Sequence, residues 1–307
     1  MNTVTKDTFD TQLRLPLMAA PMFLLSGTAL VIAAVRAGIV GVLPSMNART
    51  PALLDEWLAE ISRATVSDTE AGRTGMPALN LVTHPSNERL EADLAVCVNH
   101  RVPIVVSAVG SPKRVVEAVH RYGGAVYADV STVAHARKAV AAGADGLVLL
   151  CAGAGGNTGR LSPFAFVSEV RTFFDGPVGV AGAVNNGKAL RALKALGADF
   201  GYAGTAFIAT HESLATREYR EMIVESCADD IEENRQVSGI PANFLRKSLD
   251  RARHQFSGAH EGFDVKKEGE NLKRWKDIWA AGHGVGAVSA VEAVIDVVTR
   301  FEQEYRA

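Results

Sequence analysis

Residues 145–164 of this chain read DGLVLLCAGAGGNTGRLSPF, and they join the end of a strand to the start of a helix. The apolar run at 145–150 is typical of a strand that is buried on both faces. Ser162 and Pro163 supply the capping residue and first-turn proline that open a helix. The four glycines of the loop at 151–159 let a ligand approach the backbone closely, with Asn157 as the polar group among them. The alternative is a long glycine loop without a chemical role.

The same alternation of apolar runs and helix-period segments extends through most of the chain. Strands are predicted at 17–23, 39–43, 78–82, 104–108, 125–130, 146–150, 178–183 and 200–204. Helix-period segments lie between them, at 28–36, 52–64, 88–98, 113–121, 133–141, 164–173 and 188–196. Eight strands that alternate with helices indicate a parallel sheet, and this number favours closure into an α/β (β/α)₈ TIM barrel over an open sheet.

The pattern changes after the eighth strand, because the following segments are more polar and charged. We therefore expect a (β/α)₈ barrel at 1–211 and a helical elaboration over the barrel mouth at 212–286. This elaboration is expected to have no separate core of its own. A C-terminal amphipathic helix within 287–307 is expected to pack on the barrel.

The net charge and composition of the chain indicate what kind of molecule it binds and where it works. A formal net charge of −2 over 307 residues gives no reason to expect nucleic acid or an anionic membrane, so a small molecule is the expected partner. The uncharged segment 15–35 is long enough to cross a bilayer, but Pro16 and Pro21 argue against one helix there, and a strand followed by a helix explains it better. Three cysteines without paired spacing fit a reducing cytoplasm. An oligomer is possible.

Active sites of such barrels lie at the carboxyl ends of the strands. The ends of the seventh and eighth strands carry Gly182-Ala183 and Gly204-Thr205. Backbone N–H groups at two neighbouring glycine-containing ends are suited to hold a phosphate. The alternative is that these glycines only relieve crowding at the barrel rim.

Several other site templates are absent from the sequence. It contains no complete dinucleotide fingerprint, no lysine-containing phosphate loop and no G-x-S-x-G turn. The eight histidines show no metal-binding spacing, so no metal is expected. His84 and His283 lie near a strand end and in a glycine segment, which leaves both as candidates for acid–base chemistry.

Several segments of the sequence, taken together, resemble those of a known family. The resemblance is carried by six segments in order: MAAPM at 18–22, GAGGNTG at 153–159, SPFAF at 162–166, GA at 182–183, LGAD through GTAFIAT at 196–210, and WAAGHGVG at 279–286. Together they are similar to the nitronate monooxygenases, formerly called 2-nitropropane dioxygenases, over nearly the whole chain. Each segment alone is weak evidence, but their order and spacing are specific.

The resemblance implies an FMN-binding barrel with a defined set of ligand-binding residues. Gly182, Ala183, Gly204 and Thr205 would hold the phosphate, and Ala20, Pro21, Met22 and Asn80 would line the flavin ring and ribityl chain. Gly155, Gly156 and Asp129 complete the implied cofactor-binding set.

The chain departs from the family pattern at three places. Asn157 stands where better-known members carry a catalytic histidine, Asp129 where many carry a lysine, and His283 where many carry a glutamine. Asn157 and His283 are accordingly the expected catalytic residues. An amide can donate and accept hydrogen bonds but cannot take a proton at neutral pH. Asn157 therefore suits a nitronate that is already anionic, or an enone that awaits hydride, better than a neutral nitroalkane.

Four functions follow from these observations. The first is FMN-dependent oxidation of an alkyl nitronate by dioxygen. The second is reduction of an enoyl thioester or quinone with NAD(P)H as electron donor. The third is flavin binding without turnover. A sugar-phosphate isomerase or aldolase is the fourth, and it is disfavoured because no strand end carries the lysine or glutamate that such chemistry uses.

Overall fold

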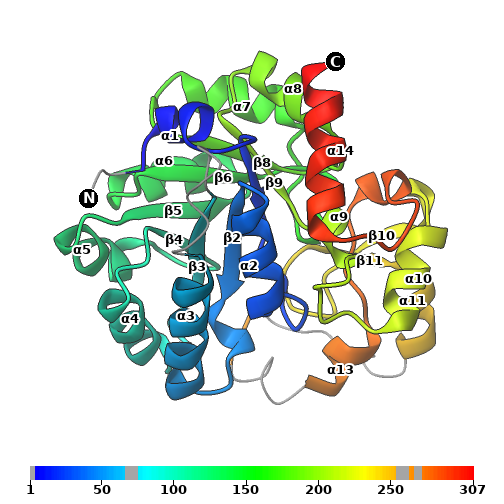
Figure 1. The fold of residues 1–307 in the computed structure, drawn as a ribbon, viewed down its shortest axis with the longest axis horizontal. Helices are drawn as coiled ribbons and strands as arrows, with labels where there is room; N and C mark the ends of the chain where they lie inside the picture. Colours follow the sequence, from blue (N-terminus) through cyan, green and yellow to red (C-terminus); the bar gives the residue numbers. More distant parts are fainter. Residues whose placement is uncertain (1–3, 66–74, 254–262, 266–271) are drawn as a thin grey trace.

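The fold is that of a computed structural model, which describes residues 4–65, 75–253, 263–265 and 272–307. Eight parallel strands close into one barrel in the order β1-β2-β3-β4-β5-β6-β8-β9 (Figure 1). Their bounds are Leu17–Ala19 (β1), Val40–Pro44 (β2), Met76–Val82 (β3), Ile104–Ala108 (β4), Ala125–Val130 (β5), Gly146–Leu150 (β6), Val178–Ala181 (β8) and Phe200–Ala203 (β9). The predicted (β/α)₈ barrel is confirmed.

Helices cover the outside of the barrel in the expected alternation. They are α2 (Thr28–Arg36), α3 (Pro51–Thr65), α4 (Leu90–Asn99), α5 (Lys113–Arg121), α6 (Val133–Ala141), α7 (Pro163–Arg171) and α8 (Gly187–Leu196). Local signals fix their ends: the Ser162 hydroxyl caps α7, and Gly197 ends α8 in the left-handed conformation at φ 98°. The segment 15–35 forms β1 and α2, and no helix in the described ranges is long and apolar enough to cross a membrane.

Side chains fill the barrel interior. Alternate residues of the strands point inward, among them Val106, Tyr127 and Phe200, and all three are fully buried. The short N-terminal helix α1 (Lys6–Thr11) contributes Phe9, whose ring stacks on Phe200 with centroids 4.3 Å apart. Because Phe9 helps to fill the barrel interior from the amino-terminal side, the large cavity lies on the opposite, carboxyl-terminal side of the strands.

The eighth helix of the ring comes from the end of the chain. Helix α14 (Val294–Arg306, red in Figure 1) packs against α8 and α2, and its buried face includes Val298 and Phe301. A long segment therefore separates β9 from the helix that completes the barrel.

The segment between β9 and α14 differs from the expected helical elaboration, because it contains strands as well as helices. It holds α9 (Thr205–Ile208), α10 (Arg217–Glu225), η3 (Ala228–Asp230), α11 (Arg246–Ala252), α13 (Leu272–Asp277) and η5 (His283–Ala287). Strands β10 (Ile231–Asn234) and β11 (Ala242–Leu245) pair antiparallel, and β11 pairs with β7 (Gly156–Asn157) from the loop after β6. It also has a small apolar cluster of its own, which corrects the expectation that it has none; the cluster includes Val237, Phe244 and Ile278.

Candidate active site

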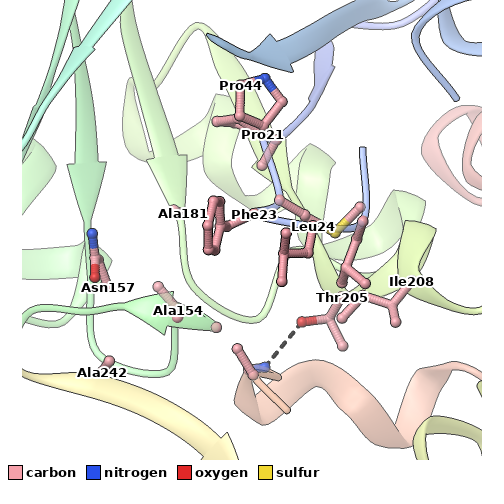
Figure 2. A pocket seen from close by; sticks show the side chains of 18 of the residues that line it. Pro21, Phe23, Leu24, Pro44, Ala154, Asn157, Ala181, Thr205, Ile208 and Ala242 are labelled. Carbon is pink, nitrogen blue, oxygen red and sulfur yellow. Dashed lines mark hydrogen bonds between the residues drawn. The ribbon is translucent and has the colours of Figure 1, made fainter. Parts of the chain in front are cut away.

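One large cavity lies at the carboxyl ends of the barrel strands. Its volume is about 890 Å³, near the upper end of the roughly 300–1,000 Å³ usual for small-molecule sites. Every barrel strand contributes a residue at or just after its end: Ala20, Pro44, Asn80, Ala108, Asp129, Leu150, Ala181 and Ala203. The added segment supplies the outer wall through residues such as Ala242, which is labelled in Figure 2. Phe244 also belongs to this wall. The cavity is where a (β/α)₈ barrel places its chemistry.

All but one of the residues predicted to contact cofactor or substrate line this cavity. They are Ala20, Pro21, Met22, Asn80, Asp129, Gly155, Gly156, Asn157, Gly182, Ala183, Gly204 and Thr205. The strand-end reasoning explains this convergence, because the ends of parallel barrel strands face one rim.

Gly182 and Ala183 have unusual backbone conformations. Their φ angles are 135° and 55°, and alanine rarely occupies the left-handed region. A positive φ costs a residue with a Cβ, such as Ala183, of the order of 1–3 kcal/mol, whereas glycine adopts it freely, and such conformations are concentrated at functional sites. Two of them in succession at the end of β8 suit a loop that is shaped to receive a ligand.

Gly204 and Thr205 provide the neighbouring wall at the end of β9. The buried Thr205 hydroxyl oxygen accepts a hydrogen bond from the Gly282 N–H at 2.9 Å, which is the dashed line in Figure 2. The hydroxyl proton stays available for donation. Thr205 therefore connects the added segment to the rim and can still donate to a bound anion.

The loop after β1 forms an apolar wall that includes Pro21 and Met22. Buried Asn47 fixes this loop: its side-chain nitrogen donates to the carbonyls of Met22 and Ser26 at 3.0 and 2.8 Å, and its oxygen accepts from the Leu24 N–H at 2.8 Å. The sequence alone does not reveal this role of Asn47, since the contact requires the folded barrel.

Asn157 belongs to a strand and not to an irregular loop. Gly156 and Asn157 pair antiparallel with Asn243 and Ala242 of β11. The Asn243 side chain, buried in the same region, donates to the Ala154 carbonyl at 2.8 Å and to the Thr158 hydroxyl at 3.3 Å. These contacts hold the glycine-rich segment in place beside the cavity.

His283 does not reach the cavity. Its backbone N–H donates to the Gly153 carbonyl at 2.9 Å, and the residue is exposed and outside the cavity lining. This position does not support the catalytic role predicted for it. His84 is also outside the lining, where its ring bonds the Ser86 hydroxyl at 2.8 Å. Within the described residues, therefore, the cavity wall contains no histidine.

Asp129 is the one carboxyl group among the described residues of the cavity wall. Burial raises its pKa to about 7, and its Oδ1 has no hydrogen-bond partner. Tyr202 of β9 lines the same cavity, and its buried hydroxyl is also without a partner. Burial, and then the nearby Asp129 charge, raise the pKa of Tyr202. Sequence reasoning named Asp129 but missed Tyr202, which was hidden in an apolar strand pattern.

An aromatic group forms part of the outer wall. Trp275 meets Phe23 edge to face, with centroids 6.1 Å apart, and lies 6.2 Å from the Phe244 ring. Phe23, Phe244 and Trp275 come from three distant parts of the sequence, so no local motif could have predicted the group. Their rings make this part of the cavity wall apolar.

Comparison with known proteins identifies the family. The profile of a family described as nitronate monooxygenase matches residues 5–300. The nitronate monooxygenase of Neurospora crassa is 28% identical over 243 residues, which is 68% of this chain and 63% of that protein. A Mycobacterium tuberculosis protein whose name gives it as a candidate monooxygenase is 31% identical over 165 residues, which is 53% of this chain. The matches to the first three curated relatives span 44%, 56% and 64% of their lengths.

Solved structures show the same fold. FabK from Thermotoga maritima superposes with a TM-score of 0.82 at 22% identity, covering 99% of this chain and 96% of that one. Nitroalkane oxidase from Streptomyces ansochromogenes gives 0.81 at 24% identity, covering 98% of both chains. The family match over nearly the whole chain, on a barrel with its cavity at the strand ends, shows that this chain belongs to the nitronate monooxygenase family.

Proposed function

We propose that this protein binds FMN and oxidises alkyl nitronates with dioxygen. The observation that carries the proposal is the convergence on one cavity of two glycine-containing strand ends, an apolar wall and the amide of Asn157. These three surfaces suit a phosphate, a flat ring and an anionic substrate, respectively.

The cavity wall fits a flavin in three respects. Gly182, Gly204 and Thr205 offer open backbone and a hydroxyl for a phosphate. Pro21 and Met22 offer an apolar surface for a planar ring. The unpartnered polar atoms of Asp129 and Tyr202 call for a ligand with a polar edge, because buried polar groups without a partner are rare in folded proteins.

Asn157 would orient the substrate without exchanging a proton with it. Its side-chain N–H groups can donate to a nitronate oxygen, and the pairing of β7 with β11 holds its backbone beside the cavity. The aromatic group of Phe23, Phe244 and Trp275 would keep water from the anion, which strengthens such hydrogen bonds. The bound flavin would supply the electron-accepting chemistry. A nitronate is already deprotonated, so this arrangement needs no histidine.

The proposal is tested with purified protein reconstituted with FMN. We expect flavin absorbance after removal of free FMN, and oxygen uptake with propyl nitronate as substrate. The matched control is the neutral parent nitropropane at the same pH, measured before it ionises, on which we expect much slower turnover. A protein that does not retain FMN would contradict the cofactor assignment, and an FMN-loaded protein inactive on nitronates would contradict the substrate.

A second candidate is an FMN-dependent reductase that transfers electrons from NAD(P)H to an enoyl thioester or quinone. The large apolar surface of the outer wall favours this function, because a short nitronate would contact only a small part of it. A Mycobacterium tuberculosis relative named as an indene-carboxyl-CoA dehydrogenase is 25% identical over 76% of this chain. NAD(P)H oxidation that depends on an added quinone or enoyl-CoA, without nitronate turnover, would assign this function.

A further inference from the structure

Two buried polar groups on the cavity wall have no partner within the described protein. Asp129 Oδ1 and the Tyr202 hydroxyl are inaccessible to solvent, and neither makes a hydrogen bond. They do not bond each other, yet they are close enough for the Asp129 charge to act on Tyr202. An unsatisfied buried polar group costs about 1–3 kcal/mol, so two beside one cavity indicate a ligand that satisfies both.

The surroundings of the pair favour the neutral form of the carboxyl group. Asp129 lies at the end of β5, where the adjacent strand ends contribute Ala108 from β4 and Leu150 from β6 to the wall. Tyr202 lies on β9 and lines the same cavity. No described cation acts on Asp129, because the charged groups elsewhere on the wall, Arg49, Arg89 and Lys276, do not contribute to its pKa.

The flavin ring has one edge that matches such a pair. Its pyrimidine edge presents an N–H between two carbonyl oxygens, whereas the opposite edge carries only methyl groups. A protonated carboxyl group can donate to one carbonyl and accept from the N–H at the same time. A tyrosine hydroxyl can donate to a carbonyl. A carboxylate could accept from the N–H but would repel both carbonyl oxygens.

We propose that Asp129, in its protonated form, and Tyr202 bind the pyrimidine edge of the flavin by hydrogen bonds. This inference rests on the proposed FMN cofactor and adds a protonation requirement to it. The apolar edge of the ring is then left for the Pro21 and Met22 side of the wall.

Flavin binding should therefore weaken as the pH rises through neutrality. If FMN binds the protonated form, binding raises the pKa of Asp129 further, so affinity is greatest below about pH 7 and falls above it. The fall can reach tenfold for each pH unit. The described wall contains no histidine, and the raised pKa of Tyr202 keeps its hydroxyl protonated across this range.

The test compares the FMN dissociation constants of the wild type and Asp129→Asn, by fluorescence titration from about pH 5.5 to about pH 8.5. The asparagine amide can make the same two hydrogen bonds as the protonated acid but cannot ionise. The pH dependence of the dissociation constant of this variant therefore gives the baseline that comes from titration of the FMN phosphate. We expect equal constants at the acidic end and a wild-type constant about tenfold larger at the alkaline end. In the wild type, ionisation of Asp129 should add to the pH dependence of the midpoint potential of the bound flavin near neutrality. Asp129→Asn should lack this added dependence.

Tyr202→Phe provides a second measurement. We expect it to weaken FMN binding severalfold at every pH without changing the shape of the pH profile. Asp175→Asn and Tyr305→Phe, which change an exposed carboxyl group and a tyrosine outside the cavity, are the matched controls and should behave as the wild type.

The outcomes separate this inference from the proposed function. If the wild type binds no FMN at any pH, the cofactor assignment fails. If FMN binds and the Asp129→Asn profile follows that of the wild type, only the inference is overturned. If Asp129→Asn and Tyr202→Phe both bind FMN as the wild type does but bind propyl nitronate more weakly, the inference is also overturned. The pair would then bind the substrate.

Discussion

Asn157 lies opposite Ala242 in an antiparallel pair, and both residues line the cavity. Asn157, predicted to stand in place of the family histidine, is therefore held by a ladder between the loop after β6 and the segment added after β9. A backbone that is fixed in this way can position a side chain reproducibly, which catalysis by orientation requires.

Asn157→Ala should lower nitronate turnover by about tenfold or more, because an oriented hydrogen-bond donor is lost where charge must be held. FMN affinity should change little, since the variant keeps the backbone pairing. Steady-state oxygen uptake and FMN titration measure the two effects. Asn157→His should permit slow turnover of neutral nitroalkanes that rises with pH near the histidine pKa of about 6.5. If both variants match the wild type in every rate, Asn157 has no part in the reaction.

Gly204→Ala should weaken FMN binding about tenfold with little change in the stability of the flavin-free protein. The added Cβ would lie 3.7 Å from Met22, an ordinary contact, and the φ of −104° is open to alanine. Gly182→Ala is a less selective change, because φ is 135° and the Cβ would lie 3.0 Å from the Ala152 carbonyl oxygen. It should also lower the free energy of unfolding by roughly 1–3 kcal/mol. Unchanged FMN affinity in Gly204→Ala would place the phosphate elsewhere.

Thr205→Val should lower the free energy of unfolding of the flavin-free protein by about 1–3 kcal/mol, because it leaves the buried Gly282 N–H without its acceptor. It should also weaken FMN binding, since a hydroxyl donor is lost. Thr205→Ser keeps the oxygen and is expected to retain both properties. Urea unfolding and FMN titration distinguish the two variants, and equal stability of the valine and serine forms would contradict the connection assigned to Thr205.

Much of the barrel could be predicted because its signals are local. The apolar runs of β4, β5 and β6 match the predicted strands residue for residue, as strands buried on both faces are uninterrupted in sequence. The strand ends and the glycine-rich loop account for the predicted residues that line the cavity. Strand β1 is shorter than expected and ends at Ala19, because the following residues form the loop that Asn47 holds.

The contacts that complete the site depend on tertiary structure. Asn243 lies far along the chain from the loop that it fixes, and Tyr202 was one apolar residue among others until the barrel set it beside Asp129. The strands β10 and β11 were missed because β10 is largely charged, β11 has only four residues, and both gain their partners only from each other and from β7.

His283→Ala should leave both FMN affinity and nitronate turnover within about twofold of the wild type, since substitutions at exposed sites rarely change function or stability much. The side chain is exposed, and the Gly153 contact uses the backbone N–H, which alanine keeps. Asn157→Ala, assayed in parallel, is the positive control. A loss of turnover in His283→Ala comparable with that of Asn157→Ala would restore His283 as a catalytic residue.

The stability that Asp129 contributes to the flavin-free protein should fall as the pH rises from about 4 to about 7, and the difference in unfolding free energy between the wild type and Asp129→Asn should change accordingly. The pKa of Asp129 is raised from its ordinary 3.8 to about 7 by burial, so the folded state holds a proton that the unfolded state has released across this range. Stability from this group is therefore complete below the unfolded pKa and lost as the pH approaches the folded one. At about 1.4 kcal/mol per pKa unit, the loss has an upper bound of roughly 4 kcal/mol. Urea unfolding at both ends of the range measures it, with Asp175→Asn as the exposed control. If Asp129→Asn and the wild type lose the same stability, Asp129 is already ionised in the folded protein, and the raised pKa assigned to it is wrong.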